Sequence, residues 1–133
     1  MTAKVLGNRS AYFRGGSDGI GGRNLPDGNI GWVGITSNAE GDVAYLSAAD
    51  VTSNDHPYLA YTIQAVGNPC TVEFTCQNVA LATNPDPSVQ ANVAWANSTP
   101  VTPGTFVTIN YGFSALKVTF SGGAGSECYI VAR

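Results

Sequence analysis

Short segments in which apolar and polar residues alternate are the feature that most narrows the possible folds of this 133-residue chain. The clearest segment is CTVEFTCQ, where Cys70, Val72, Phe74 and Cys76 occupy alternate positions and polar residues stand between them. A period of two is typical of a strand that buries one face. The segment therefore predicts a strand whose apolar side packs against a second layer.

Six further segments between residues 42 and 133 predict strands: DVAYLSA, YLAYTIQAV, SVQANVAWAN, TFVTINY, ALKVTF and ECYIVAR. Connectors rich in Pro, Asn, Asp and Gly separate most of them and would interrupt a sheet ladder. About seven short strands at this spacing predict an all-β fold, an antiparallel β-sandwich of immunoglobulin-like or jelly-roll-like type. The side chains expected to point inward are Leu59, Tyr61, Ile63, Ala65, Val89, Ala91, Val93, Trp95, Val107, Ile109, Tyr111 (with Phe106 on the opposite face), Leu116, Val118, Phe120 and Ile130.

The first 41 residues have a different composition, since nine of the sixteen glycines lie at or before Gly34. Glycine loses more backbone freedom on ordering than any other residue, so such a segment should not fold alone. We therefore expect an extended N-terminal arm over residues 1–41, held by a partner subunit, and a sandwich domain over residues 42–133. The residues expected to bind the partner are Arg9, Tyr12, Phe13, Arg14, Ile20, Arg23, Ile30 and Trp32.

The charge distribution indicates what kind of partner the arm would meet. The net charge is −3, but residues 1–24 carry four basic side chains against one carboxylate (+3), and residues 25–133 carry two against eight (−6). The basic residues of the arm do not form a run of Lys and Arg, so they are only a weak signal of nucleic-acid binding. The acidic residues 25–133 would also repel phosphate groups. An acidic protein surface is the better partner. The chain also has no apolar run long enough to span a membrane and no signal-peptide pattern, so we expect synthesis in a cytoplasm.

Few residues of the chain could carry catalysis or bind a metal. The single histidine, His56, lies in SNDHPY and is expected to be a turn residue, and the common hydrolase, metalloprotease and nucleotide-binding motifs are absent. Cys70 and Cys76 are about 20 Å apart along one strand and cannot bridge, although a Cys76–Cys128 disulfide is possible if their strands face each other. Buried free thiols are the preferred interpretation. We expect no enzyme activity, no cofactor and no metal, because neither zinc-type cysteine pairs nor a calcium loop occurs.

The layout of the whole chain resembles that of small head-decoration (cement) proteins of tailed bacteriophages. The resemblance depends on the segment MTAKVLGNRSAYFRGG followed by a Thr-, Val- and Asn-rich domain such as VTPGTFVTINYGFSALKVTFSGG. It implies a virion structural protein made in the host bacterial cytoplasm, which binds major capsid protein subunits on the capsid surface as a homo-oligomer and stiffens the shell. Fibre, baseplate and tail proteins share the same style.

A second interpretation is a recognition module of a fibre, tail or baseplate that binds carbohydrate or a host surface. Exposed aromatic side chains such as Trp32, Tyr58 or Trp95 would then serve as stacking platforms. A free binding module has no evident use for a glycine-rich arm with apolar anchors, so we prefer the assembly interpretation.

Overall fold

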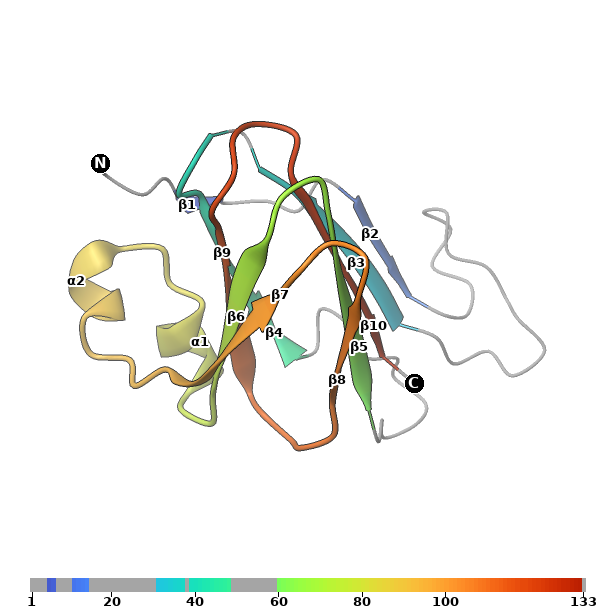
Figure 1. Ribbon diagram of the computed structural model, residues 1–133. Coiled ribbons are helices and arrows are strands. Elements are labelled where there is room, and N and C mark those ends of the chain that lie inside the picture. Colours follow the sequence, from blue (N-terminus) through green and yellow to red (C-terminus); the bar gives the residue numbers. More distant parts are fainter. Residues whose placement is uncertain (1–4, 7–10, 15–30, 38, 49–59, 133) are drawn as a thin grey trace.

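A computed structural model of the chain describes residues 5–6, 11–14, 31–37, 39–48 and 60–132, with side chains described for 33–37, 39–48 and 60–131. These parts form ten strands in two stacked sheets and two four-residue helices (Figure 1). The predicted all-β sandwich is confirmed.

The first sheet, called sheet A, has the strand order β1-β4-β9-β6-β7. Neighbouring strands are antiparallel except β1, which runs parallel to β4 at the edge. The strands are β1 (Val5–Leu6), β4 (Val43–Ser47), β9 (Ala115–Phe120), β6 (Cys70–Thr75) and β7 (Ala96–Val101).

The second sheet, sheet B, has the order β2-β3-β10-β5-β8 and is antiparallel throughout. Its central strand pairs on both sides, so that Ile130 lies between Val33 and Ile63. The strands are β2 (Ala11–Arg14), β3 (Gly31–Thr36), β10 (Glu127–Ala132), β5 (Tyr61–Val66) and β8 (Phe106–Ile109).

The core lies between the two sheets and consists of the alternate residues that each strand points inward. Burial of one such side chain contributes about 1.5–3 kcal/mol to folding, and the largest contributions come from the side chains that are fully enclosed. Predicted inward residues that are buried are Tyr61, Ile63, Ala65, Cys70, Val72, Phe74, Ile109, Leu116, Val118, Phe120 and Ile130.

The predicted boundary at residue 42 is wrong, because the sandwich includes strands from the segment expected to be an arm. Val33 and Ile35 are only 0% and 1% exposed and belong to the core, and β3 pairs with both β2 and β10. β1 is likewise an edge strand of sheet A. The glycines around Val33 and Ile35 hid the alternation that this short strand shares with the others.

The strand predicted over residues 88–97 is also wrong. Residues Pro87–Gln90 form helix α2, which begins at Asp86, whose carboxylate accepts a hydrogen bond from the backbone N–H of Ser88. Helix α1 (Val79–Ala82) begins in the same way at Asn78. Such N-cap bonds satisfy amides that a helix leaves unpaired. Both helices lie on the side of sheet A that faces away from sheet B (Figure 1), and β7 begins only at Ala96.

Several expected core residues therefore lie elsewhere. Val89 and Val93 are half-buried and Ala91 is exposed. The ring of Trp95 covers the outer face of sheet A, stacked on Tyr45 with ring centroids 6.0 Å apart. These residues follow the helix caps, so their alternation does not reflect an extended backbone.

Two positions at strand ends also depart from the predicted alternation. Strand β6 ends at Thr75, which is buried, and the next residue, Cys76, is exposed. Strand β8 ends at Ile109, so Tyr111 lies beyond it and is 37% exposed. All three cysteines are free thiols, so the possible Cys76–Cys128 disulfide is not formed.

Candidate functional site

The outer face of sheet B carries a groove of about 520 Å³ between three neighbouring strands. It contains no ionised side chain, and its most prominent member is Phe106, which is 70% exposed. These side chains point outward because the residues that alternate with them, among them Ile63 and Ile130, point into the core. The groove is lined by Thr62, Gln64, Phe106, Tyr129 and Val131.

The backbone register continues this face toward the N-terminal strands. Val131 is paired with Trp32, and Trp32 is paired in turn with Phe13. Two of the predicted partner-binding residues therefore lie in the cross-strand row of a groove residue.

The other predicted partner-binding residues do not join this row. Tyr12 is paired with Val33, in a row whose described members Val33 and Ile130 belong to the core, and Arg14 is paired with Gly31. The remaining four, Arg9, Ile20, Arg23 and Ile30, lie outside the described residues.

One polar contact orders the end of the groove. The Tyr129 hydroxyl donates a hydrogen bond to Oε2 of Glu127, two residues earlier on the same strand. This bond to a carboxylate raises the pKa of Tyr129, because ionisation would bring two negative charges together. The hydroxyl therefore stays protonated well above neutral pH and holds the ring in place.

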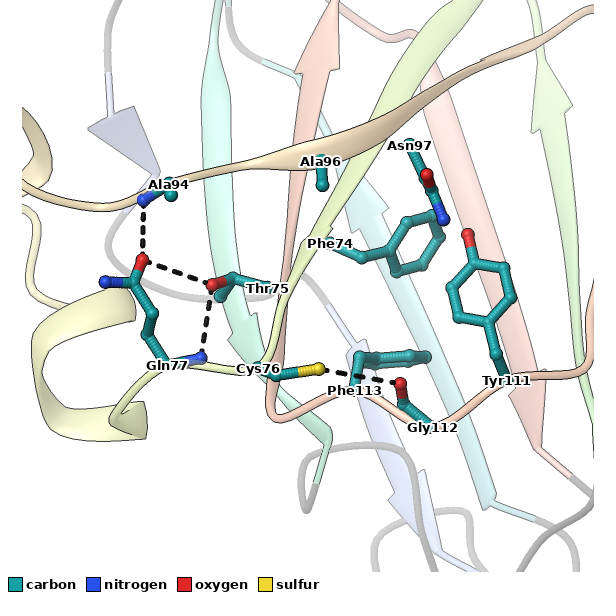
Figure 2. Close-up of a pocket in the computed structure, with 10 residues that line it drawn as sticks. All are labelled: Phe74, Thr75, Cys76, Gln77, Ala94, Ala96, Asn97, Tyr111, Gly112 and Phe113. Atoms are coloured by element: carbon teal, nitrogen blue, oxygen red, sulfur yellow. Dashed lines mark hydrogen bonds between the residues drawn. The ribbon is translucent and has the colours of Figure 1, made fainter.

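A second hollow, of about 430 Å³, lies where β6 and β7 meet the segment that joins β8 to β9 (Figure 2). Three aromatic rings form its apolar wall. Phe74 lies edge-on to Tyr111 with ring centroids 5.4 Å apart, and it contacts Phe113 at 5.0 Å. The lining residues are Phe74, Thr75, Cys76, Gln77, Ala94, Ala96, Asn97, Tyr111, Gly112 and Phe113.

Hydrogen bonds fix one side of this pocket. Oε1 of Gln77 accepts from the backbone N–H of Ala94 at 2.5 Å and from the hydroxyl of Thr75 at 3.4 Å (Figure 2). The hydroxyl of Ser114 donates to the carbonyl oxygen of Gln77 at 2.5 Å, and its backbone N–H donates to that of Thr75 at 2.9 Å. The chain leaving β6 is thereby tied to the chain entering β7 and β9.

The opposite side is shaped by a bulge in β7. Val72 pairs with Thr99 and Phe74 pairs with Ala96, so Asn97 and Ser98 together stand opposite Glu73. Asn97 has a φ of 54°, in the left-handed region that Asn tolerates better than most residues. Figure 2 shows its side chain directed toward the hydroxyl of Tyr111.

A third cluster lies on the outer face of sheet A, around Trp95. Lys117 lies 5.2 Å from the centre of its ring and 3.3 Å from Oε1 of Glu73. The indole N–H donates to Oε1 of Gln90 at 3.2 Å. Burial, with a smaller contribution from Glu73, raises the pKa of Tyr45. Through these contacts Trp95 fastens helix α2 to the sheet.

The described residues were also compared with what a metal site and a membrane-spanning helix require. No group of three His, Cys, Asp or Glu side chains among these residues could hold a metal ion. Neither of the two helices there is long and apolar enough for a membrane span. His56 and Tyr58 lie outside the described residues.

The groove and the pocket are not evident in the sequence, because each depends on neighbours distant in the chain. The TFVTINY alternation places Phe106 on the face opposite Ile109, but it does not indicate that Phe106 lines a groove. Asn97 carries no sequence signal, because its role depends on the bulge against β6. Comparison with family models, with curated proteins and with solved structures gave no match to this chain.

Proposed function

We propose that this chain is a non-enzymatic structural protein of a phage virion, which binds major capsid protein subunits on the capsid surface and stabilises the shell. The outer face of sheet B would be the docking surface. The single observation that carries the proposal is the groove with the exposed ring of Phe106, in which Val131 also lies; Val131 is paired with Trp32, and Trp32 is paired in turn with Phe13. This pairing joins the predicted anchors to an apolar groove.

The chemistry of this face suits a protein partner. A ring as exposed as that of Phe106 gains about 1.5–3 kcal/mol when it is buried, and aromatic residues dominate the energy of many interfaces. The groove offers hydroxyl and amide groups from Thr62, Gln64 and Tyr129 around this anchor. An apolar centre with a polar surround is the usual composition of a specific interface.

The charge pattern supports an acidic partner surface. Four of the six basic residues stand in residues 1–24, which include β1 and β2 at the edges of the two sheets. Carboxylates on the capsid subunit would pair with them. None of the five residues that line the groove is charged, and the nearest carboxylate, that of Glu127, accepts a hydrogen bond from the Tyr129 hydroxyl.

The test is a rebinding assay with purified phage particles that lack this protein. Particles are mixed with purified chain and sedimented, and bound chain is measured against the major capsid protein. We expect saturable binding that Phe106→Ala weakens at least tenfold. Tyr111→Ala is the matched control, because Tyr111 is also an exposed aromatic residue but lines the other pocket.

Stabilisation is measured on the same particles, as the temperature at which they release DNA. This temperature should rise when the chain is added and rise less with Phe106→Ala. Unchanged binding of Phe106→Ala would show that sheet B is not the docking surface. Failure of the wild-type chain to bind any site on the particles would refute the capsid function itself.

A further inference from the structure

We propose that the pocket between β6, β7 and the 110–114 segment binds one neutral pyranose ring of a saccharide. This site shares no lining residue with the groove on sheet B, so it does not depend on the capsid function proposed above. Its volume of about 430 Å³ lies in the lower part of the range of small-molecule pockets, about 300–1,000 Å³. The pocket could hold a sugar ring with part of a second one.

The lining excludes charged ligands. None of its ten residues is Asp, Glu, Lys, Arg or His. A phosphate, sulfate or carboxylate would lose its water without gaining a cation. Nucleotides and acidic sugars are therefore poor ligands, although their planar or cyclic parts would fit. Residues 25–133 as a whole are acidic, which adds to the repulsion.

The same lining is too polar for a purely apolar ligand. The amide of Asn97 and the hydroxyl of Tyr111 make no hydrogen bond to any described residue, and each can donate and accept. An apolar group covering them would strip their water without replacing it, at a cost of about 1–3 kcal/mol per group. A ligand for this pocket must present hydroxyl or amide groups of its own.

A pyranose meets both conditions, because it has an apolar C–H face and an edge of hydroxyl groups. The wall formed by Phe74, Tyr111 and Phe113 offers the aromatic surface for the C–H face. Asn97 and Tyr111 then lie at the edge where hydroxyl groups would project (Figure 2). Aromatic rings that combine apolar area with a polar tip are suited to such ligands.

The bulge in β7 explains why the Asn97 amide lies at the edge of the pocket. In a regular antiparallel pairing one residue of β7 would stand opposite Glu73, but here Asn97 and Ser98 both do, and Asn97 adopts the left-handed conformation. Bulges commonly redirect a side chain next to a functional site. The fixed bonds of Gln77 to Ala94 and Thr75 keep the facing rim rigid, so the site is formed before a ligand arrives.

Binding is tested by two-dimensional ¹H–¹⁵N NMR on the full chain. The probes are the neutral methyl glycosides of glucose, mannose, galactose and N-acetylglucosamine, with methyl sialoside as the anionic comparison. We expect saturable shifts of the amide signals of Asn97 and Gly112 with at least one neutral glycoside. Methyl sialoside should cause none.

Two conservative variants then test the residue roles. Asn97→Gly keeps the left-handed backbone but removes the amide, and Tyr111→Phe keeps the ring but removes the hydroxyl. Each should weaken binding about two- to tenfold, as expected for one hydrogen bond of about 0.5–1.5 kcal/mol. Phe106→Ala is the matched control and should bind sugar as the wild type does.

Thermal melts confirm that each variant is folded before its affinity is compared. Absence of shifts with every neutral glycoside, together with no binding on an array of neutral glycans, would overturn the proposal. So would equal binding of methyl sialoside, or unchanged affinity in both Asn97→Gly and Tyr111→Phe.

Discussion

The contrast between Phe74 and Trp95 gives the sharpest test of the packing. Both side chains were expected between the sheets, but only Phe74 is there, 3% exposed, whereas Trp95 lies on the outer face of sheet A. Phe→Ala in a core costs about 3–5 kcal/mol. Because Phe74 also borders the open pocket, water can fill part of the space its ring leaves, so we expect a loss near 3 kcal/mol for Phe74→Ala.

For Trp95→Ala the loss is worked from its three contacts. Stacking on Tyr45 contributes about 0.5–1.5 kcal/mol, the contact with the half-buried Lys117 about 0.5–1 kcal/mol, and the bond to Gln90 a similar amount. These values are not additive, and water replaces part of each, so we expect a loss of about 1–2 kcal/mol.

Urea unfolding followed by far-UV circular dichroism measures both losses, as shifts of the midpoint at constant slope. A domain of this kind has about 5–15 kcal/mol of stability, so both variants should remain folded without urea. Trp95→Phe is the control and should lose less than Trp95→Ala, since it keeps a ring on Tyr45. If Trp95→Ala costs as much as Phe74→Ala, the outer-face position of Trp95 is wrong.

Three further predictions concern other parts of the fold. A thiol reagent should modify only the exposed Cys76 in the native protein and three thiols after unfolding; three fast thiols in the native state would contradict the burial of the other two. Hydrogen bonds from Ser88 lower the pKa of the Asp86 carboxyl in the folded protein. The stabilisation from the ionised carboxylate is therefore complete above the unfolded-state pKa, and it is lost as the pH falls through the lower folded-state pKa. An NMR titration should place the midpoint of Asp86 below that of an unfolded peptide. Gly122→Ala should lower the melting temperature, because an added Cβ would lie 2.3 Å from side-chain atoms of Asn68. An unchanged melting temperature would contradict this prediction and show that the Asn68 side chain moves aside freely.

The sequence predicted the strands whose alternation is uninterrupted. In residues 116–120 and 61–65 every second side chain is buried, as expected, because one face of each strand packs on the opposite sheet. The segment 88–97 has the same alternation, but Asp86 and Pro87 stand directly before it and start a helix. A local helix signal competed there with a strand pattern, and the helix signal decided the structure.

The candidate sites were less predictable, for a different physical reason. Trp32 was identified from its type, but its place beside Val131 follows from a pairing between residues almost a hundred positions apart. The pocket forms because Asn97, on β7, and Tyr111, after β8, both line it although they belong to different parts of the fold. The bulge that contains Asn97 arises from the pairing of β7 with β6, so neither strand's sequence predicts it alone. Local patterns report which face of a segment is apolar. They do not report which segments become neighbours.

The central position of β10 in sheet B has a consequence for the order in which the chain can fold. Strands β3 and β5 do not pair with each other; each pairs on one edge with β10 (Glu127–Ala132) and on its other edge with β2 or β8. A nascent chain on the ribosome therefore holds β3 and β5 without their common neighbour until residues 127–132 have been made. Pairings over such a separation form slowly and leave strand edges exposed meanwhile. Sheet A needs no residue beyond Phe120, so its strands can pair first and offer a surface on which sheet B is completed.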